Sequence, residues 1–145
     1  MVEVQHLREG AIQTVELGIA PPPEAGAVLS FAGTVRNHHQ GRAVRGIHYH
    51  AYRPLAESTL ATLEQQALEQ FELAACAVHH AVGELLVGDI SVYIQTASAH
   101  RDAAYAANRW LIDSIKQSVP IWKQEHYSDG LSSFVAGQTI REISG

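Results

Sequence analysis

Cysteine, lysine and long apolar runs are scarce in this chain of 145 residues. Its single cysteine, Cys76, has no intrachain disulfide partner, which is typical of a reducing compartment, and we expect the cytoplasm. No apolar run reaches the roughly 20 residues of a membrane-spanning helix. The first ten residues carry Glu3 and Glu9 and lack an apolar core, so we expect no signal peptide. These absences argue against a disulfide-stapled or membrane-embedded protein.

Basic residues are outnumbered, because 10 lysines and arginines stand against 15 acidic residues and leave a formal net charge of −5. This balance argues against broad attraction to nucleic acid or to anionic lipid. Any site for an anion must therefore be a local pocket.

Compact metal-binding motifs such as HExxH and CxxC are absent, although the chain has nine histidines. His48 and His50 share one face of a predicted strand, and the adjacent pairs at 38–39 and 79–80 add possible ligands. Zinc needs three or four convergent ligands, and nothing in the spacing brings them together. We therefore expect surface or pocket-lining histidines and no metal, with a metal-dependent hydrolase as an open alternative.

Hydrophobic periodicity predicts helices over residues 54–71 and 101–118, the second with Ser98 as a possible cap and Pro120 as its stop. Alternating or β-branched segments predict six strands, at residues 27–36, 45–52, 76–82, 89–97, 121–127 and 132–137. The order ββαββαββ indicates a single α+β domain over residues 1–145, with a mainly antiparallel sheet.

Three local features complete this prediction. Residues 20–26, APPPEAG, are interpreted as a stiff linker that separates a polar N-terminal segment from the body. The strand at 27–36 should be largely buried, because Ala27, Leu29 and Phe31 alternate with other small or apolar residues. Residues 37–44 are interpreted as a mobile polar loop with Gly41 in its turn.

The only two lysines lie seven positions apart, in SAHRDAAYAANRWLIDSIKQSVPIWKQE. Lys116 should project from the last helical turn and Lys123 from the strand after Pro120, so both ammonium groups can face one cleft. A partly buried lysine beside other cations can lose its proton near neutral pH and act as a base or nucleophile. The alternative is that both lysines are solvated surface residues, which is the common case for lysine.

Other basic residues can extend such a pocket. His100 and Arg101 lie near the other end of the helix, where free backbone N–H groups favour anions. Arg36 ends the first predicted strand and could join them. Arginine stays charged and grips phosphate or carboxylate as a fork, so the set suits an anionic substrate and a proton-transfer step.

The remaining reactive or large side chains have structural explanations. Cys76 alternates with Val78 in a predicted strand, and we interpret it as a buried structural thiol. Trp110 and Trp122 are interpreted as core or interface anchors rather than as stacking platforms.

Several segments resemble the large, catalytic subunit of molybdopterin synthase, in collinear order from about Gly26 to Gly137. They are GAVLSFAGTVRNHHQG, HAYRPLAE, VGELLVGD, SAHRDAAYAANRWLIDSIKQSVPIWKQE and the trailing DG. SAHR followed by a helix and K…PIWK is specific to that family, whereas residues 1–25 match loosely.

The resemblance implies an α/β hammerhead-type fold and a homodimer. Each large subunit of the family binds a small ubiquitin-like subunit whose C-terminal Gly-Gly carries a thiocarboxylate, which gives a heterotetramer. The tail delivers sulfur to cyclic pyranopterin monophosphate, and two transfers build the dithiolene of molybdopterin. The resemblance thus implies a sulfurtransferase of molybdenum cofactor biosynthesis that needs neither a metal nor another cofactor, because the partner supplies the sulfur.

The family's functional positions fall on named residues here. Its catalytic lysines correspond to Lys116 and Lys123, the first for acid/base work and tail recognition, the second for the pterin or its leaving phosphate oxygen. The anion-pocket positions correspond to Arg36, His100 and Arg101, some of them supplied across the dimer interface. In addition, Phe31 occupies a family position beside the tail channel.

Two departures from the family pattern stand out. Some members carry an arginine where this chain has Gly137, and the nearby Arg141 does not align with it. His50 stands where acidic residues are common in the family. A third reading, a noncatalytic anion-binding dimer that kept the fold, is disfavoured by the intact SAHR segment and both lysines.

Overall fold

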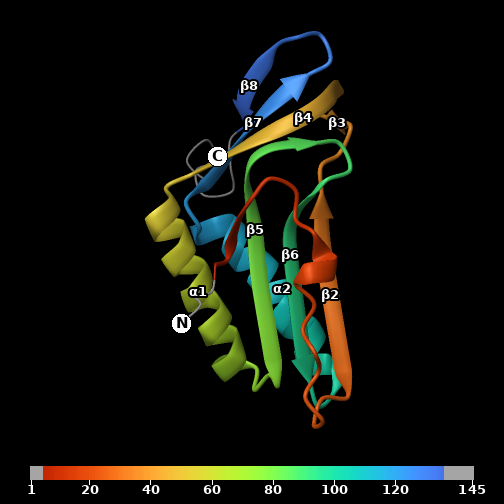
Figure 1. Cartoon of the computed structure of the whole chain (residues 1–145), viewed down its shortest axis with the longest axis vertical. Coiled ribbons are helices and arrows are strands. Elements are labelled where there is room, and N and C mark those ends of the chain that lie inside the picture. Colours follow the sequence, from red (N-terminus) through yellow and green to blue (C-terminus); the bar gives the residue numbers. More distant parts are fainter. Residues whose placement is uncertain (1–4, 136–145) are drawn as a thin grey trace.

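The computed structural model describes residues 5–135 (Figure 1). It contains two long α-helices, α1 (Arg53–Gln70) and α2 (Arg101–Ser118), and one short 3-10 helix, η1 (Thr14–Glu16). The strands are β1 (Leu7–Glu9), β2 (Ala27–Thr34), β3 (His38–His39), β4 (Arg42–Ala51), β5 (Ala75–Leu86), β6 (Ile90–Ser98), β7 (Ile121–Tyr127) and β8 (Ser132–Val135). Both predicted helices and all six predicted strands are present.

The sheet runs in the order β2-β6-β5-β4-β7-β8, and all of these neighbours are antiparallel. Off this path, β1 pairs with β5 in parallel and β3 pairs with β4. The prediction of an α+β fold with a mainly antiparallel sheet is confirmed.

Strand β5 belongs to both halves of this sheet. Its first part, Ala75–His80, pairs with β6, and its last part, Gly83–Leu86, pairs with β4. Gly83 has a φ of +93°, a conformation that L side chains rarely adopt, and Figure 1 shows β5 curving at its upper end. The prediction placed a connection at residues 83–89, but the glycine lets the strand turn there and continue.

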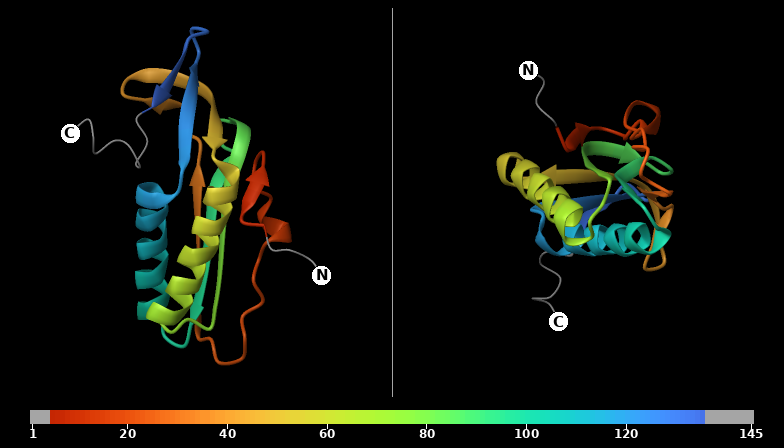
Figure 2. Two further views of the ribbon diagram at one scale, coloured as in Figure 1. Left: turned by 90° about the vertical axis from the view of Figure 1, so that its left-hand side faces the viewer. Right: turned by 90° about the horizontal axis from the view of Figure 1, so that it is seen from below.

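Helix α1 packs against β5, and helix α2 packs against β6 and β2, so both helices cover the same face of the sheet (Figure 2). Leu60 and Leu63 of α1 and Leu111 and Ile115 of α2 recur at helical spacing, which places each set on one face. They meet Val78, Val92 and Ile94 in one buried cluster. Burying each large apolar side chain contributes roughly 1.5–3 kcal/mol, so this layer fixes α2 on the sheet.

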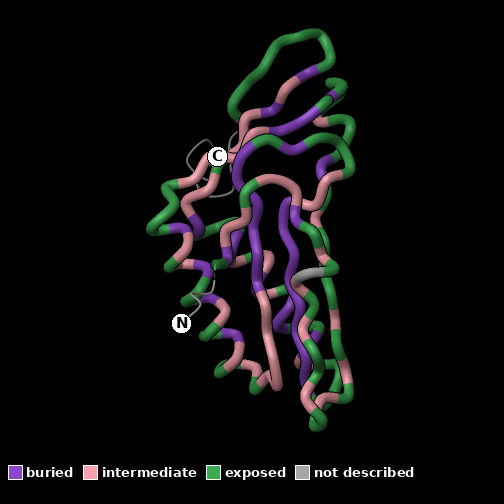
Figure 3. Tube along the Cα trace, in the orientation of Figure 1, coloured by how far each residue is buried: buried purple, intermediate pink, exposed green. Residues whose placement is uncertain are grey.

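A second buried cluster joins the two halves of the sheet. It contains Ile12, Val35, Val44, Ile47, Ala81, Leu85, Tyr93 and Tyr127. Figure 3 shows burial concentrated along β5 and β6, with an exposed loop at the β7–β8 tip. Across residues 5–135, neither helix has both the length and the apolar character that a bilayer crossing requires.

Three local predictions were wrong. Strand β2 has no fully buried residue, because it is the edge strand beside β6 and leaves Val28 and Phe31 exposed. The segment before the linker is part of the body, since β1 pairs with β5 and His6 is buried. The 37–44 loop is a tight β3–β4 hairpin. Its turn residues Gln40 and Gly41 have positive φ, so the turn at Gly41 is confirmed.

The cysteine and the tryptophans lie largely as expected. Cys76 is partly buried against the core, and burial raises the pKa of its thiol to about 12, so it is not a reactive thiolate. Trp110 packs on Phe71 with ring centroids 5.8 Å apart. Trp122 is 38% exposed and stacks on His50, so it is not a core residue of the single chain.

Candidate active site

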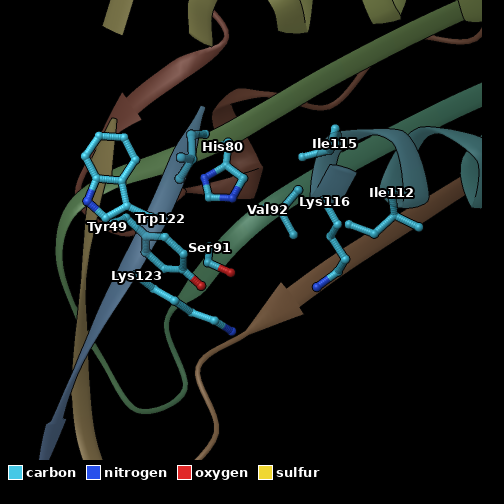
Figure 4. Close-up of a pocket in the computed structure, with 10 residues that line it drawn as sticks. Tyr49, His80, Ser91, Val92, Ile112, Ile115, Lys116, Trp122 and Lys123 are labelled. Atoms are coloured by element: carbon cyan, nitrogen blue, oxygen red, sulfur yellow. The ribbon is translucent and has the colours of Figure 1, made fainter. Parts of the chain in front are cut away.

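The corner between α2 and β7 brings the two lysines to one pocket (Figure 4). Helix α2 ends at Ser118, and Pro120 sits between the helix and the strand. Lys116 belongs to the last helical turn and Lys123 to the start of β7. The pocket holds about 510 Å³ of space, part of it open to solvent. The other lining residues are Tyr49, His80, Ser91, Val92, Ile112, Ile115, Ile121 and Trp122.

The environment of Lys123 makes its proton easier to remove. Burial is the largest cause that lowers its pKa, and the charges of Lys116 and Arg36 lower it further. Glu125 acts in the opposite direction but does not cancel these effects. Lys123 is therefore suited to exchange a proton with a bound reactant.

Arg36 lines a second hollow next to the first, of about 320 Å³. Tyr49 and Lys123 line both hollows and form the wall between them. The remaining lining residues of the second hollow are Thr34, Val35, His38, His39, Ile47 and Glu125. The structure thus brings Arg36 into the hollow beside Lys123.

Glu125 is the acidic residue of this region, and it is almost completely buried. The hydroxyl of Tyr127 donates to its Oε1 at 3.1 Å, and Nδ1 of His39 lies 3.7 Å from its Oε2. These contacts fix the carboxylate in the wall of the second hollow, and Glu125 does not line the lysine pocket.

His100 and Arg101 do not reach the lysine pocket of the same chain. They lie at the start of α2, and roughly 22 Å of helix axis separates Arg101 from Lys116. Both side chains are exposed. Ser98 does not cap the helix as predicted, because His100 occupies the N-cap position and the Ser98 hydroxyl donates to the His100 carbonyl.

Phe31 also lies outside both hollows. It pairs with Ile94 across β2 and β6 and is 37% exposed on the edge strand. Gly137 and Arg141 fall outside the described residues.

The sequence prediction missed one pocket residue with a chemically active side chain, Tyr49. Strand alternation could have identified Tyr49, because His48 and His50 share one face and Tyr49 must point to the other. Burial raises the pKa of Tyr49, partly offset by a hydrogen bond to Ser91. His80 lines the pocket, in agreement with the expectation of surface or pocket-lining histidines, although the sequence prediction gave it no individual role.

The expectation of surface or pocket-lining histidines fails for two residues. His6 and His79 are buried away from the lysine pocket, and the His6 side chain contacts Glu57 and Glu64. Between residues 5 and 135, no group of three His, Cys, Asp or Glu side chains is placed to hold a metal ion.

Comparison with known proteins identifies the family of this chain. The family model described as MoaE protein matches residues 5–118, most of the chain. The chain belongs to the MoaE family. This confirms the recognition made from the sequence motifs, and it makes the chain an enzyme of the molybdopterin synthase type, a sulfurtransferase of molybdenum cofactor biosynthesis.

Curated MoaE relatives carry the name molybdopterin synthase catalytic subunit. The one from Bacillus subtilis is 44% identical over 107 residues, covering 74% of this chain and 68% of the relative. The one from Thermoplasma volcanium is 40% identical over 112 residues, covering 77% of this chain and 82% of the relative.

Solved structures share the fold. Molybdopterin synthase from Staphylococcus aureus superposes with a TM-score of 0.82 at 35% identity, covering 93% of this chain and 98% of that one. A complex of subunits 1 and 2 of molybdopterin-converting factor from Helicobacter pylori has a TM-score of 0.71 at 20% identity, covering 89% and 88%. At that identity the second likeness concerns the fold alone.

Proposed function

We propose that this MoaE chain transfers sulfur from the thiocarboxylated C-terminal glycine of a small ubiquitin-like subunit to cyclic pyranopterin monophosphate. Two such transfers form the dithiolene of molybdopterin. The observation that carries the proposal is the single pocket that holds Lys116 and Lys123, with Arg36 in the adjoining hollow. The partner supplies the sulfur, so the proposal requires no resident metal or cofactor.

The charge of the pocket suits this reaction because both reactants are anions. A thiocarboxylate and a cyclic phosphate repel each other as they approach, and cationic groups in a poorly solvated site offset that repulsion. The whole chain has a formal net charge of −5, so this attraction is local to the pocket.

The two lysines take different roles. Lys116 recognises the incoming tail and performs acid/base work, and a covalent link between the tail and this lysine is compatible with its position. Lys123 meets the pterin or its leaving phosphate oxygen. The lowered pKa of Lys123, caused by burial and then by the two neighbouring cations, supports proton transfer by this residue. Arg36 orients the phosphate from the adjoining hollow.

A second copy of the chain completes the proposed site. His100 and Arg101 lie too far from the lysines within one chain, so in this proposal they reach the pocket of the partner in a homodimer. Phe31, exposed on the edge strand, contacts the tail of the small subunit. With one small subunit on each large subunit, the assembly is a heterotetramer, and we place it in the cytoplasm.

Reconstitution with defined components tests the proposal. Purified protein, thiocarboxylated small subunit and cyclic pyranopterin monophosphate are mixed, and the dithiolene product is measured by mass spectrometry. Product should form with the wild-type chain and with Arg109→Ala, a control at an 80% exposed side chain on the same helix. Absence of product with the wild-type chain and fully thiocarboxylated partner would refute the proposed reaction.

A further inference from the structure

His80 is a buried imidazole in the wall of the lysine pocket that the proposed roles do not use. It lies on β5, pairs with Val92 of β6 and precedes the bend at Gly83 by three residues. Figure 4 shows its ring beside the space into which Lys116 and Lys123 extend.

The hydrogen bond of one ring nitrogen fixes the tautomer. Nδ1 of His80 lies 2.7 Å from the carbonyl oxygen of Ala81. A carbonyl oxygen only accepts, so Nδ1 carries the hydrogen and Nε2 is left with a lone pair when the ring is neutral. Tyr49 packs edge-on at 5.1 Å between centroids and restricts the orientation of the ring.

The surroundings keep this imidazole neutral. The pKa of His80 is lowered to about 4, chiefly by burial and to a smaller extent by the charges of Lys116 and Lys123. The hydrogen bond to Ala81 opposes these effects without reversing them. At neutral pH the ring therefore offers the pocket an acceptor and no positive charge.

Among the described residues, none donates a hydrogen bond to Nε2. The lysines of this pocket are hydrogen-bond donors, whereas Nε2 of His80 is an acceptor. Its lone pair repels phosphate and thiocarboxylate oxygens, so Nε2 selects against these groups. It accepts readily from N–H groups. A reduced pterin carries ring N–H and amino donors, whereas its cyclic phosphate and the thiocarboxylate group at the end of the tail carry only acceptors.

We propose that His80 is a specificity-determining residue whose Nε2 accepts a hydrogen bond from an N–H group of the pterin. This hydrogen bond orients the heterocycle toward His80 and the cyclic phosphate toward the lysines and Arg36. This inference rests on the proposed function. It adds the recognition of the heterocycle, for which the lysines and Arg36 provide no acceptor.

Binding titrations with two probes separate this role from general anion binding. His80→Phe should weaken binding of cyclic pyranopterin monophosphate about tenfold, the effect of one lost hydrogen bond to a buried acceptor. It should leave the weaker binding of inorganic phosphate unchanged. His80→Gln, whose amide oxygen can replace Nε2, should recover part of the pterin affinity. Lys123→Ala should weaken binding of both probes.

Nitrogen NMR of the wild-type protein labelled with ¹⁵N-histidine gives a test that requires no variant to fold. Nε2 of His80 should show the shift of an unprotonated nitrogen at pH 7, and that signal should move when the pterin binds. A protonated Nε2, an unmoved signal, or unchanged pterin affinity in folded His80→Phe would overturn this inference while leaving sulfur transfer intact. Failure of the wild-type chain to bind the pterin would overturn the proposed function and this inference together.

Discussion

Lys123 lies directly opposite Tyr49 across the β4–β7 ladder, and these two side chains form the wall shared by both hollows of the site. Cross-strand partners lie side by side on one face of a sheet, so we expect the phenol ring to cover part of the lysine stem. Burial is the largest cause of the lowered pKa of Lys123. The ionisation of this lysine therefore depends on the side chain facing it across the sheet.

This dependence can be measured because the chain has only two lysines. With ¹³C-labelled lysine, Lys123 should titrate below its ordinary value, and Lys116→Arg assigns the signal while preserving the nearby charge. Tyr49→Ala should move the pKa of Lys123 back up by admitting water. Arg36→Ala should also raise it, by removing a neighbouring charge. A Lys123 signal that titrates at the ordinary value in the wild type would contradict this account.

Removing either lysine should nearly stop product formation. Lys116→Ala and Lys123→Ala should each lower the rate at least about 100-fold, a typical loss when an acid/base group is removed, with circular dichroism spectra like the wild type. Lys123→Arg should retain more pterin affinity than Lys123→Ala but little turnover, because arginine keeps the charge and does not release its proton. Turnover like the wild type in either alanine variant would remove that residue from the mechanism.

Arg36→Ala should act mainly on binding. The loss of one charged contact to phosphate should weaken pterin affinity about tenfold or more, measured by titration calorimetry. Arg42→Ala is the matched control, since Arg42 lies in the same hairpin region but pairs with Asp129 at 3.2 Å. Equal affinities in the two variants would rule out a phosphate role for Arg36.

The buried His6 contact predicts a pH-dependent stability. The pKa of His6 is raised, and the largest cause is its hydrogen bond to Glu64. Burial acts to lower this pKa, whereas the hydrogen bond to Glu57 raises it further. Because the pKa of His6 is raised in the folded state, protonation of His6 stabilises the fold. This stabilisation is fully present below the pKa of His6 in the unfolded chain, about 6.5. It is lost as the pH rises through the higher pKa of His6 in the folded protein. For Glu57, burial acts to raise the pKa, but hydrogen bonds from His6 and Leu7 leave it lowered, so acid also removes the contact.

Urea unfolding across pH 4–9 measures this effect. His6→Phe should cost about 1–3 kcal/mol near pH 5.5, the typical loss for a hydrogen bond to a charged partner. The difference from wild type should shrink above neutral pH. The exposed His38→Phe serves as control. A difference that grows with increasing pH would show that the sign is wrong.

Local pattern was enough to predict the helices and strands that build the site. Helical spacing from Leu111 to Ile115 and the stop at Pro120 placed Lys116 beside Lys123, because a helix end and the next strand start are close in any fold. The same reasoning could not reveal that β2 is an edge strand, since an apolar edge strand and a central one have similar composition.

Long-range contacts account for what the pattern missed. Three residues, Leu7–Glu9, are too few to give a period, and β1 forms through parallel pairing with β5 and the anchoring of His6 on α1. Tyr49 and His80 come from separate strands, so their meeting at the pocket requires the sheet order. The length of α2 alone separates His100 from Lys116. The proposed site therefore requires a second copy of the chain if His100 is to reach the lysine pocket.

The bend at Gly83 has a mechanical consequence. Because one continuous strand pairs with β4 in one half of the sheet and with β6 in the other, we expect a large movement of one half against the other to strain this backbone pairing. The lysine pocket lies at that junction, so the sheet sets the backbone positions of Tyr49, His80 and Lys123 before any ligand binds. Such preorganisation leaves little backbone rearrangement to be made during turnover. In the proposed reaction, the slower motions are therefore those of the small subunit's tail as it enters and leaves.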